Sequence, residues 1–90
     1  MVNSMFTPGY LQLIAAVVAM RKAAGLTQRQ LAERMGREHS FVARVETGQR
    51  RVDLVEFVWI CRACEADPLE ETRKLVQATT SGPPRRRARR

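Results

Sequence analysis

Hydrophobic side chains recur every three or four residues near the start of the chain. This is the period of an amphipathic α-helix, and it predicts a first helix from about Pro8 to Ala24. Thr7 is a suitable N-cap residue, and proline is favoured in a first helical turn because its missing N–H group costs nothing there. Gly25 is expected to end the helix, since a residue without Cβ readily adopts the left-handed conformation. The apolar stripe of this helix consists of Leu11, Ile14, Ala15, Val18 and Ala19.

Four shorter helical segments follow, and each has its own start or stop signal. Thr27 and Asp53 each stand three residues before a Gln or a Glu, which is the spacing of a capping box. Gly36 and Gly48 close the second and third segments, and Asp67 with the proline after it opens the fifth. The four helices are predicted over about residues 28–35, 39–46, 54–64 and 68–78. Five helices joined by connections of a few residues predict an all-α fold.

The ends of the chain lack this periodicity. Residues 1–6 are predicted to be a flexible leader, and residues 79–90, with Ser-Gly-Pro-Pro and an arginine run, a disordered basic tail. The folded domain is therefore expected to span residues 7–78. The second and fifth helices carry the apolar residues Leu31, Ala32, Met35, Leu69, Leu75 and Val76. The inward positions predicted for the third and fourth helices are Val42, Val45, Leu54, Phe57, Val58, Cys61 and Cys64.

Charge is distributed unevenly along the chain, whose net charge is +7. Residues 20–53 carry eight basic and four acidic side chains, whereas residues 54–80 carry three basic and five acidic ones. Five more arginines lie in the last six residues. A basic half suits a polyanionic partner such as nucleic acid, and the arginine tail suits phosphates. The alternatives are that the basic half is only a solvated surface and that the arginine tail is only a solubilising end of the chain.

Several classes of protein are not expected. The longest apolar stretch, from Tyr10 to Met20, is too short to cross a membrane, and no basic residue precedes it as in a signal peptide. A cytoplasmic protein is therefore expected. Cys61 and Cys64 have no further zinc ligands near them, so they are expected to be core residues. Because no catalytic arrangement or phosphate-cradling loop appears, we expect no enzyme, metal, cofactor or small-molecule ligand.

The second and third predicted helices are both short and are separated by only Gly36, Arg37 and Glu38. A three-residue turn that contains glycine makes the second of two helices cross the first at a steep angle. Such a crossing leaves one side of the helix at residues 39–46 uncovered by protein. A helix of this width fits the major groove of double-stranded DNA, where each base pair shows a distinct pattern of donors and acceptors.

These segments resemble the Cro and phage-repressor (XRE-type) helix-turn-helix family. The likeness rests on the run from Leu26 to Gly36, on Val42, and on Val-Glu-Thr-Gly at residues 45–48, and it extends from about residue 11 to residue 69. The resemblance implies a compact five-helix, lambda-repressor-like domain. It further implies a nucleoid-associated protein that binds a palindromic DNA operator as a homodimer and controls transcription, acting most simply as a repressor.

The resemblance also implies roles for individual residues. The base-reading set consists of His39, Ser40, Phe41 and Arg44. The phosphate-contacting set consists of Thr27, Gln28, Arg37, Thr47, Arg50 and Arg51. Gln28 is further implied to brace the third helix, and Arg21 is implied to form a structural ion pair with Glu46. Two residues depart from the family pattern, because Glu38 stands where Ser, Thr or Asn is common and Phe41 is large for a surface that enters a groove.

Elementary chemistry supports two of these roles separately. Arg44 can donate two hydrogen bonds to O6 and N7 of a guanine, which is worth roughly 1–3 kcal/mol of discrimination against other bases. The free N–H groups at the start of the second helix, with the helix dipole behind them, suit an anionic phosphate.

The fourth helix carries more apolar surface than a small domain needs to bury. Val55 and Trp59 stand four residues apart, beside the inward stripe, and an additional apolar stripe indicates a partner surface. We expect these two residues, with part of the fifth helix, to form the homodimer interface. Two other functions stay open at this point. One is an antitoxin or antiactivator that grips a different protein with this face, and the other is non-specific coating of nucleic acid through the arginine tail.

Overall fold

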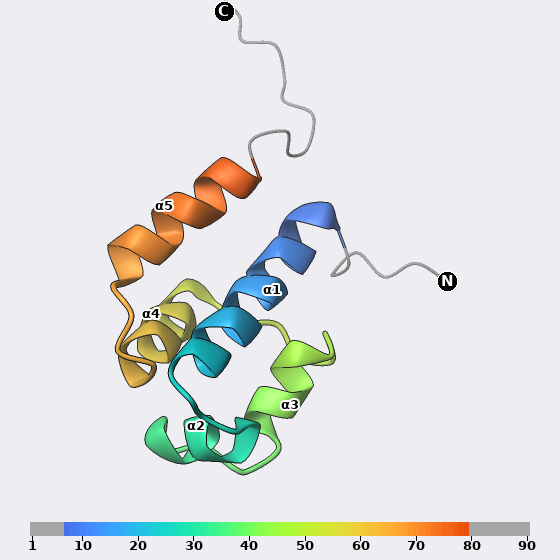
Figure 1. The fold of residues 1–90 in the computed structure, drawn as a ribbon. Coiled ribbons are helices and arrows are strands. Elements are labelled where there is room, and N and C mark those ends of the chain that lie inside the picture. The colour runs from blue at the N-terminus through green and yellow to red at the C-terminus, as the bar shows by residue number, and fades with distance from the viewer. Residues whose placement is uncertain (1–6, 80–90) are drawn as a thin grey trace, which may run out of the picture.

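A computed structural model describes residues 7–79 and shows five helices and no strand in that range (Figure 1). The helices are α1 (Pro8–Ala23), α2 (Gln28–Arg34), α3 (Phe41–Glu46), α4 (Leu54–Ala63) and α5 (Pro68–Ala78). The predicted all-α fold is confirmed. The predicted leader and all but the first residue of the predicted tail lie outside the described residues. Within residues 7–79, no helix is long and apolar enough to cross a membrane.

The helices begin where the sequence places their caps. The Thr7 hydroxyl accepts a hydrogen bond from the Tyr10 N–H at 3.2 Å, and proline occupies the first turn of α1. Thr27 and Asp53 both form the predicted capping boxes, with the side chains of Gln30 and Glu56 bonding back to the N-cap N–H groups. These local bonds satisfy N–H groups that a helix leaves free at its start, so four of the five helix starts were predictable. The exception is α3.

The core lies between α1, α2, α3 and α4. Its fully buried side chains are Val17, Leu31, Val42, Val45, Ile60 and Cys61. The stripe predicted for α1 is wrong, because Leu11, Ala15 and Ala19 are exposed and α1 instead buries Tyr10, Val17 and Met20. Most faces of α1 are apolar, so its periodicity did not specify which side turns inward.

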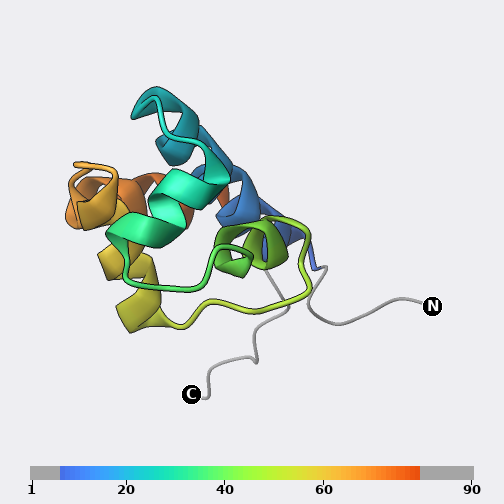
Figure 2. The ribbon, with the colours of Figure 1, turned by 90° about the horizontal axis from the view of Figure 1, so that it is seen from below.

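The later helices show a similar shift. Leu54 is exposed and Val58 is only partly buried, whereas Ile60 is buried beside Phe57, Cys61 and Cys64. Helix α5 contacts α1 and α4 but buries none of its own residues, and Leu69 near its start is 80% exposed. Figure 1 shows α3 and α5 on opposite sides of α1, and Figure 2, seen from below, shows α2 and α3 in front of α1. Helix α5 is therefore an outer layer, and the core is built by the other four helices.

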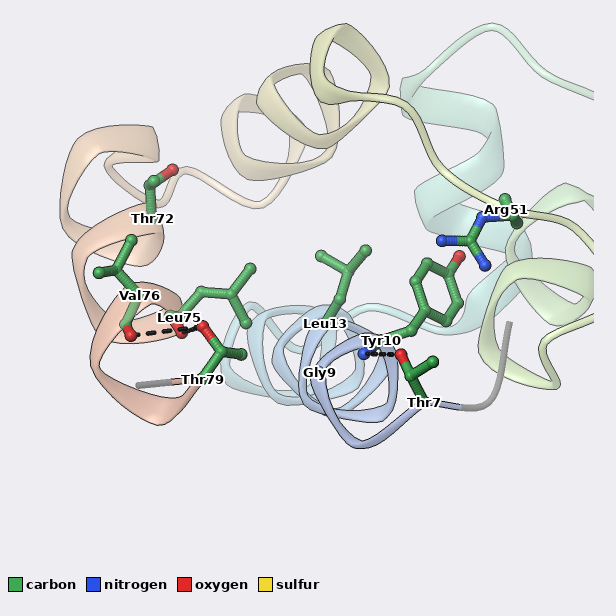
Figure 3. A pocket seen from close by; sticks show the side chains of 9 residues that line it. All are labelled: Thr7, Gly9, Tyr10, Leu13, Arg51, Thr72, Leu75, Val76 and Thr79. Carbon is green, nitrogen blue, oxygen red and sulfur yellow. Dashed lines mark hydrogen bonds between the residues drawn. The ribbon is translucent and has the colours of Figure 1, made fainter. Parts of the chain in front are cut away.

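A groove of about 400 Å³ separates part of α1 from the end of α5 (Figure 3). Leu13 of α1 and Leu75 of α5 lie on its walls, and Arg51 lies beside Tyr10 at one end. Leu75 also borders a second groove between the same two helices, of about 270 Å³, opposite small residues of α1 such as Ala15 and Ala19. Leu75 thus borders both hollows where α5 meets α1.

The two cysteines are core residues, as predicted. Both are unpaired and buried. Burial raises the pKa of Cys61 to about 11, and it also raises the pKa of Cys64. Thiols in this state are a small fraction ionised at neutral pH, so they act as apolar packing rather than as nucleophiles or ligands.

Helix α4 ends in a left-handed residue that is not glycine. The Ala66 N–H bonds to the Cys61 carbonyl at 2.8 Å and the Glu65 N–H to the Arg62 carbonyl at 3.0 Å, which is the Schellman arrangement. Glu65 takes a φ of 58° there, whereas the same position after α1 is Gly25 with a φ of 73°. A residue with a Cβ is strained in this conformation.

Replacing Glu65 by glycine is therefore expected to stabilise the domain. Glu65→Gly should raise the free energy of unfolding by about 1 kcal/mol, because glycine reaches the left-handed region without a steric penalty. Urea unfolding measures the change. Gly25→Ala is the matched control, since nothing lies within 4 Å of the added Cβ and only the backbone strain changes; it should lower stability by about 1 kcal/mol. Equal stabilities for Glu65→Gly and the parent chain would contradict the strain at residue 65.

Candidate nucleic-acid interface

Helices α2 and α3 pack against each other through a turn that begins at Gly36. The Arg37 N–H bonds to the Ala32 carbonyl at 2.9 Å while Gly36 takes a φ of 68°, which reverses the chain directly after α2. Helix α3 begins at Phe41 rather than at His39 as predicted. Ser40 occupies the N-cap position with a helical backbone conformation, and its side chain makes no capping bond. His39 and Ser40 therefore lie directly before the N-terminus of α3 and not in its first turn.

Helix α3 has one buried side and one open side. Phe41, Val42 and Val45 are buried in the core. Ser40, Arg44 and Thr47 are exposed, and their spacing of four and three residues puts them on one face of the helix. This is the uncovered surface that the sequence predicted, and Arg44 lies in its middle.

The structure overturns the predicted role of Phe41. Its side chain is only 2% exposed, so the ring is not available to a base edge. The guanidinium groups of Arg37 and Arg50 lie 4.5 and 4.9 Å from the ring centre, a distance at which cations are attracted to an aromatic face. Phe41 is large because it fills the core and supports two arginines, which also explains its departure from the family pattern.

The same two arginines surround a buried carboxylate that sequence reasoning did not single out. Arg50 donates to both oxygens of Glu56 at 2.8 and 2.9 Å, and Arg37 donates to one of them at 2.8 Å. These bonds, those of Arg50 first, lower the pKa of Glu56 to about 2, and the bond to Glu56 raises the pKa of Arg50. The Asp53–Glu56 capping box was the visible signal, but the arginines come from distant positions. Arg37 and Arg50 were predicted to contact phosphates, and each keeps part of its side chain in solvent.

The loop after α3 is anchored on Tyr10 of α1. The Val52 N–H donates to the Tyr10 hydroxyl at 3.1 Å, and the guanidinium of Arg51 lies 4.2 Å from the centre of the same ring. Arg51 itself is exposed. The loop therefore holds Arg50 and Arg51 in fixed places beside the end of α3.

At the last residue of α3, Glu46 joins three helices. Arg21 of α1 donates to both of its oxygens at 2.7 and 3.1 Å, and Gln28 of α2 donates to one at 2.8 Å. The bond to Glu46 raises the pKa of Arg21. The structure thus bears out the ion pair between Arg21 and Glu46 and the brace from Gln28. Thr27 and Thr47 remain exposed near this junction.

Two looser polar side-chain contacts lie on the open surface. Arg44 contacts Glu38 at 3.3 Å, and Nε2 of His39 lies 3.5 Å from a carboxylate oxygen of Glu33. All four side chains are at least half exposed. Exposed pairs of this kind contribute about 0–1 kcal/mol to stability, so each can open at little cost when a ligand competes.

The predicted partner surface on α4 is exposed in the single chain. Trp59 is 50% exposed, and Val55 and Leu54 are more exposed still. Together these three residues form an apolar strip along α4, which we call the α4 strip. No group of three or more metal-binding side chains occurs within residues 7–79.

Comparison with known proteins is consistent with this geometry. A family model described as a helix-turn-helix domain matches residues 15–75. The structure is similar to that of an XRE-family-like protein from Pseudomonas syringae pv. tomato, with 41% identity, a TM-score of 0.74, and coverage of 79% of this chain and 87% of that one. It is also similar to the restriction-modification controller protein C.AhdI from Aeromonas hydrophila, with 34% identity, a TM-score of 0.60, and coverage of 68% and 92%. The clp gene regulator ClgR from C. glutamicum shows 26% identity, a TM-score of 0.64, and coverage of 80% and 90%. Among curated proteins, none matches the chain.

Removal of the buried charge tests the cluster around Glu56. Because the folded-state pKa is about 2, below the ordinary 4.5, the carboxylate stabilises the fold fully above pH 4.5 and this contribution disappears as the pH falls toward 2. Glu56→Gln is expected to lower the free energy of unfolding at pH 7 by about 3 kcal/mol, because two arginines lose a buried partner. It should also flatten the decrease in stability between those two pH values.

Glu70→Gln is the control for that substitution. Glu70 pairs with Arg73 at 3.4 Å on the surface of α5, so its loss should change stability by less than about 0.5 kcal/mol. Thermal unfolding across the acid range measures both variants. An unchanged pH dependence in Glu56→Gln would contradict the lowered pKa.

Proposed function

The chain belongs to the XRE-type helix-turn-helix family, and on that premise we propose that it is a regulator of transcription that binds a palindromic DNA operator as a homodimer. The observation that carries this proposal is the bare side of α3. Its inner residues are packed in the core, while Ser40, Arg44 and Thr47 face solvent from one side. Such a helix has the right width to enter the major groove. Bound at a promoter, the protein would act most simply as a repressor by occupying the site.

The reading of bases would fall mainly to Arg44. Its guanidinium would donate two hydrogen bonds to O6 and N7 of a guanine. Ser40 and His39, at the mouth of α3, would reach neighbouring base edges, because the N-terminal part of a recognition helix enters the groove most deeply. Phe41 has no part in this reading.

Phosphates would be held at both ends of the helix pair. The free N–H groups at the start of α2, with Thr27 and Gln28 beside them, suit one phosphate. Thr47, Arg50 and Arg51 would meet the backbone beyond the end of α3. Arg37 would add charge from the turn. These contacts orient the protein without reading sequence.

The Glu46 junction supports the proposal on energetic grounds. Gln28 bonds to Glu46 from the start of α2, and Arg21 bonds to it from α1. Helices α1, α2 and α3 are thus joined before DNA arrives. A rigid reading surface loses less conformational entropy on binding than a flexible one.

The homodimer would form through the α4 strip of Leu54, Val55 and Trp59. A half-exposed tryptophan beside two exposed aliphatic residues is the kind of anchor that dominates protein interfaces. A two-fold axis beside this strip would set two α3 helices about 34 Å apart, which is one turn of duplex. An operator with two inverted half-sites would match that symmetry.

Substitution of Arg44 tests the reading of bases. A preferred duplex is first selected from a random pool with the unaltered protein, and dissociation constants for it and for random duplex are then measured at one salt concentration. Arg44→Ala should weaken binding to the preferred site by about 10- to 100-fold and should weaken binding to random duplex much less. Arg73→Ala, on α5, removes the same charge and should leave the specificity ratio intact. A pool that yields no duplex preferred by about 10³ over random sequence would contradict the proposed function.

Sedimentation tests the dimer. Trp59→Glu places a charge on the α4 strip and is expected to convert the protein to monomers, since a buried unpaired charge opposes association. Leu11→Glu is the control, because Leu11 is an exposed apolar residue on α1. A dimer that survives Trp59→Glu would rule out this interface. A dimer that forms only with a different protein would favour the antitoxin or antiactivator alternative.

A further inference from the structure

We propose that Glu38 and Arg44 read one G·C base pair together, with Arg44 on the guanine and Glu38 on the paired cytosine. This inference rests on the proposed function and adds a specificity-determining residue to it. It concerns the residue that departs from the family pattern by being acidic. On this interpretation the operator contains a G·C pair that the protein recognises on both strands.

The backbone of Glu38 is held close to the N-terminus of α3. Its carbonyl accepts a hydrogen bond from the Phe41 N–H at 3.0 Å, and Phe41 is locked in the core. The backbone at residue 38 is therefore tied to the first turn of the recognition helix. The side chain turns to the open face, where it is 62% exposed and its Oε2 lies 3.3 Å from Nη1 of Arg44.

The two side chains present a donor and an acceptor side by side. Arginine can only donate hydrogen bonds, and an ionised glutamate can only accept them. In the major groove, guanine offers the acceptors O6 and N7 while its partner cytosine offers the N4 amino group as a donor. Guanine O6 and cytosine N4 are hydrogen-bonded neighbours within the pair. A donor and an acceptor about 3 Å apart on the protein therefore match both bases at once.

Other base pairs oppose the same two groups. An A·T pair would set the adenine N6 donor against Arg44 and the thymine O4 acceptor against Glu38. A donor would then face a donor and an acceptor would face an acceptor, so discrimination comes from repulsion as well as attraction. A reversed C·G pair exchanges donor and acceptor and is rejected for the same reason.

Glu38 differs in this respect from the other acidic residues near the interface. The side chains of Glu46 and Glu56 are each only 6% exposed and are hydrogen-bonded to arginines or glutamine. Glu33 is exposed, but it faces His39 rather than Arg44. A carboxylate on a surface that approaches phosphates weakens binding through repulsion. A hydrogen bond from a cytosine amino group would offset that repulsion on the correct sequence alone.

The experiment begins by locating the base pair. Selection from a random duplex pool is run with the parent protein and with Arg44→Ala, and the guanine whose preference is lost in the variant is the one that Arg44 reads. The cytosine opposite that guanine is then replaced by N4-methylcytosine. This base still pairs with guanine, but a methyl group takes the place of the outward-facing N4 hydrogen.

Three proteins are compared on the two duplexes, namely the parent, Glu38→Ala and Glu33→Ala. Methylation of the duplex should weaken its binding by the parent and by Glu33→Ala about tenfold, because both proteins retain the carboxylate at residue 38. For Glu38→Ala, methylation should change the dissociation constant by less than about twofold, because the carboxylate that contacts the N4 amino group is already absent. Both substitutions remove one exposed negative charge, so any general gain in affinity is shared and cancels in the comparison.

Each outcome bears on a separate claim. A preferred duplex on which the parent and Glu38→Ala respond equally to methylation would overturn the joint reading and leave the proposed function standing. A pool that returns no preferred duplex would overturn the proposed function, and the joint reading with it.

Discussion

The open surface of α3 depends on a buried carboxylate at each of its flanks. Glu46, the last residue of α3, accepts hydrogen bonds from Arg21 of α1 and Gln28 of α2. Because hydrogen bonds to a shielded charge are strong and directional, the short helix takes a single orientation in which only its outer side meets solvent. A helix of six residues would not be stable alone. Its geometry is set by this junction and by the three side chains that it buries.

The second carboxylate orders the positive charge around the interface. Glu56 holds Arg37 and Arg50 against Phe41, and Arg51 rests on Tyr10 nearby. Guanidinium groups that are already placed lose less entropy on meeting a phosphate than freely moving ones. The cluster of two arginines and one glutamate keeps a net positive charge. It therefore serves packing and electrostatics with the same side chains.

The sequence predicted the structural features that depend on residues close together in the chain. Capping boxes at Thr27 and Asp53 involve residues three positions apart, and they formed as expected. The link between Arg21 and Glu46 was available because the family resemblance supplied it. Contacts that join distant segments were missed, as with Glu56 and its two arginines. The rotation of α1 was also missed, because the periodicity of a helix that is apolar on most faces does not specify which side turns inward. Phe41 illustrates the same limit, since only tertiary structure reveals that its ring points inward.

The exposure of α5 predicts an uneven stability across the domain. No residue of α5 is buried, and Leu75 lies between two hollows where the helix meets α1. Segments that bury little of their own surface undergo local unfolding at a free-energy cost below that of global unfolding. Helix α5 is therefore expected to open at a lower free-energy cost than the four-helix core that holds α3. Amide hydrogens of α5 would then exchange with solvent through a different opening reaction from those of α2 and α3.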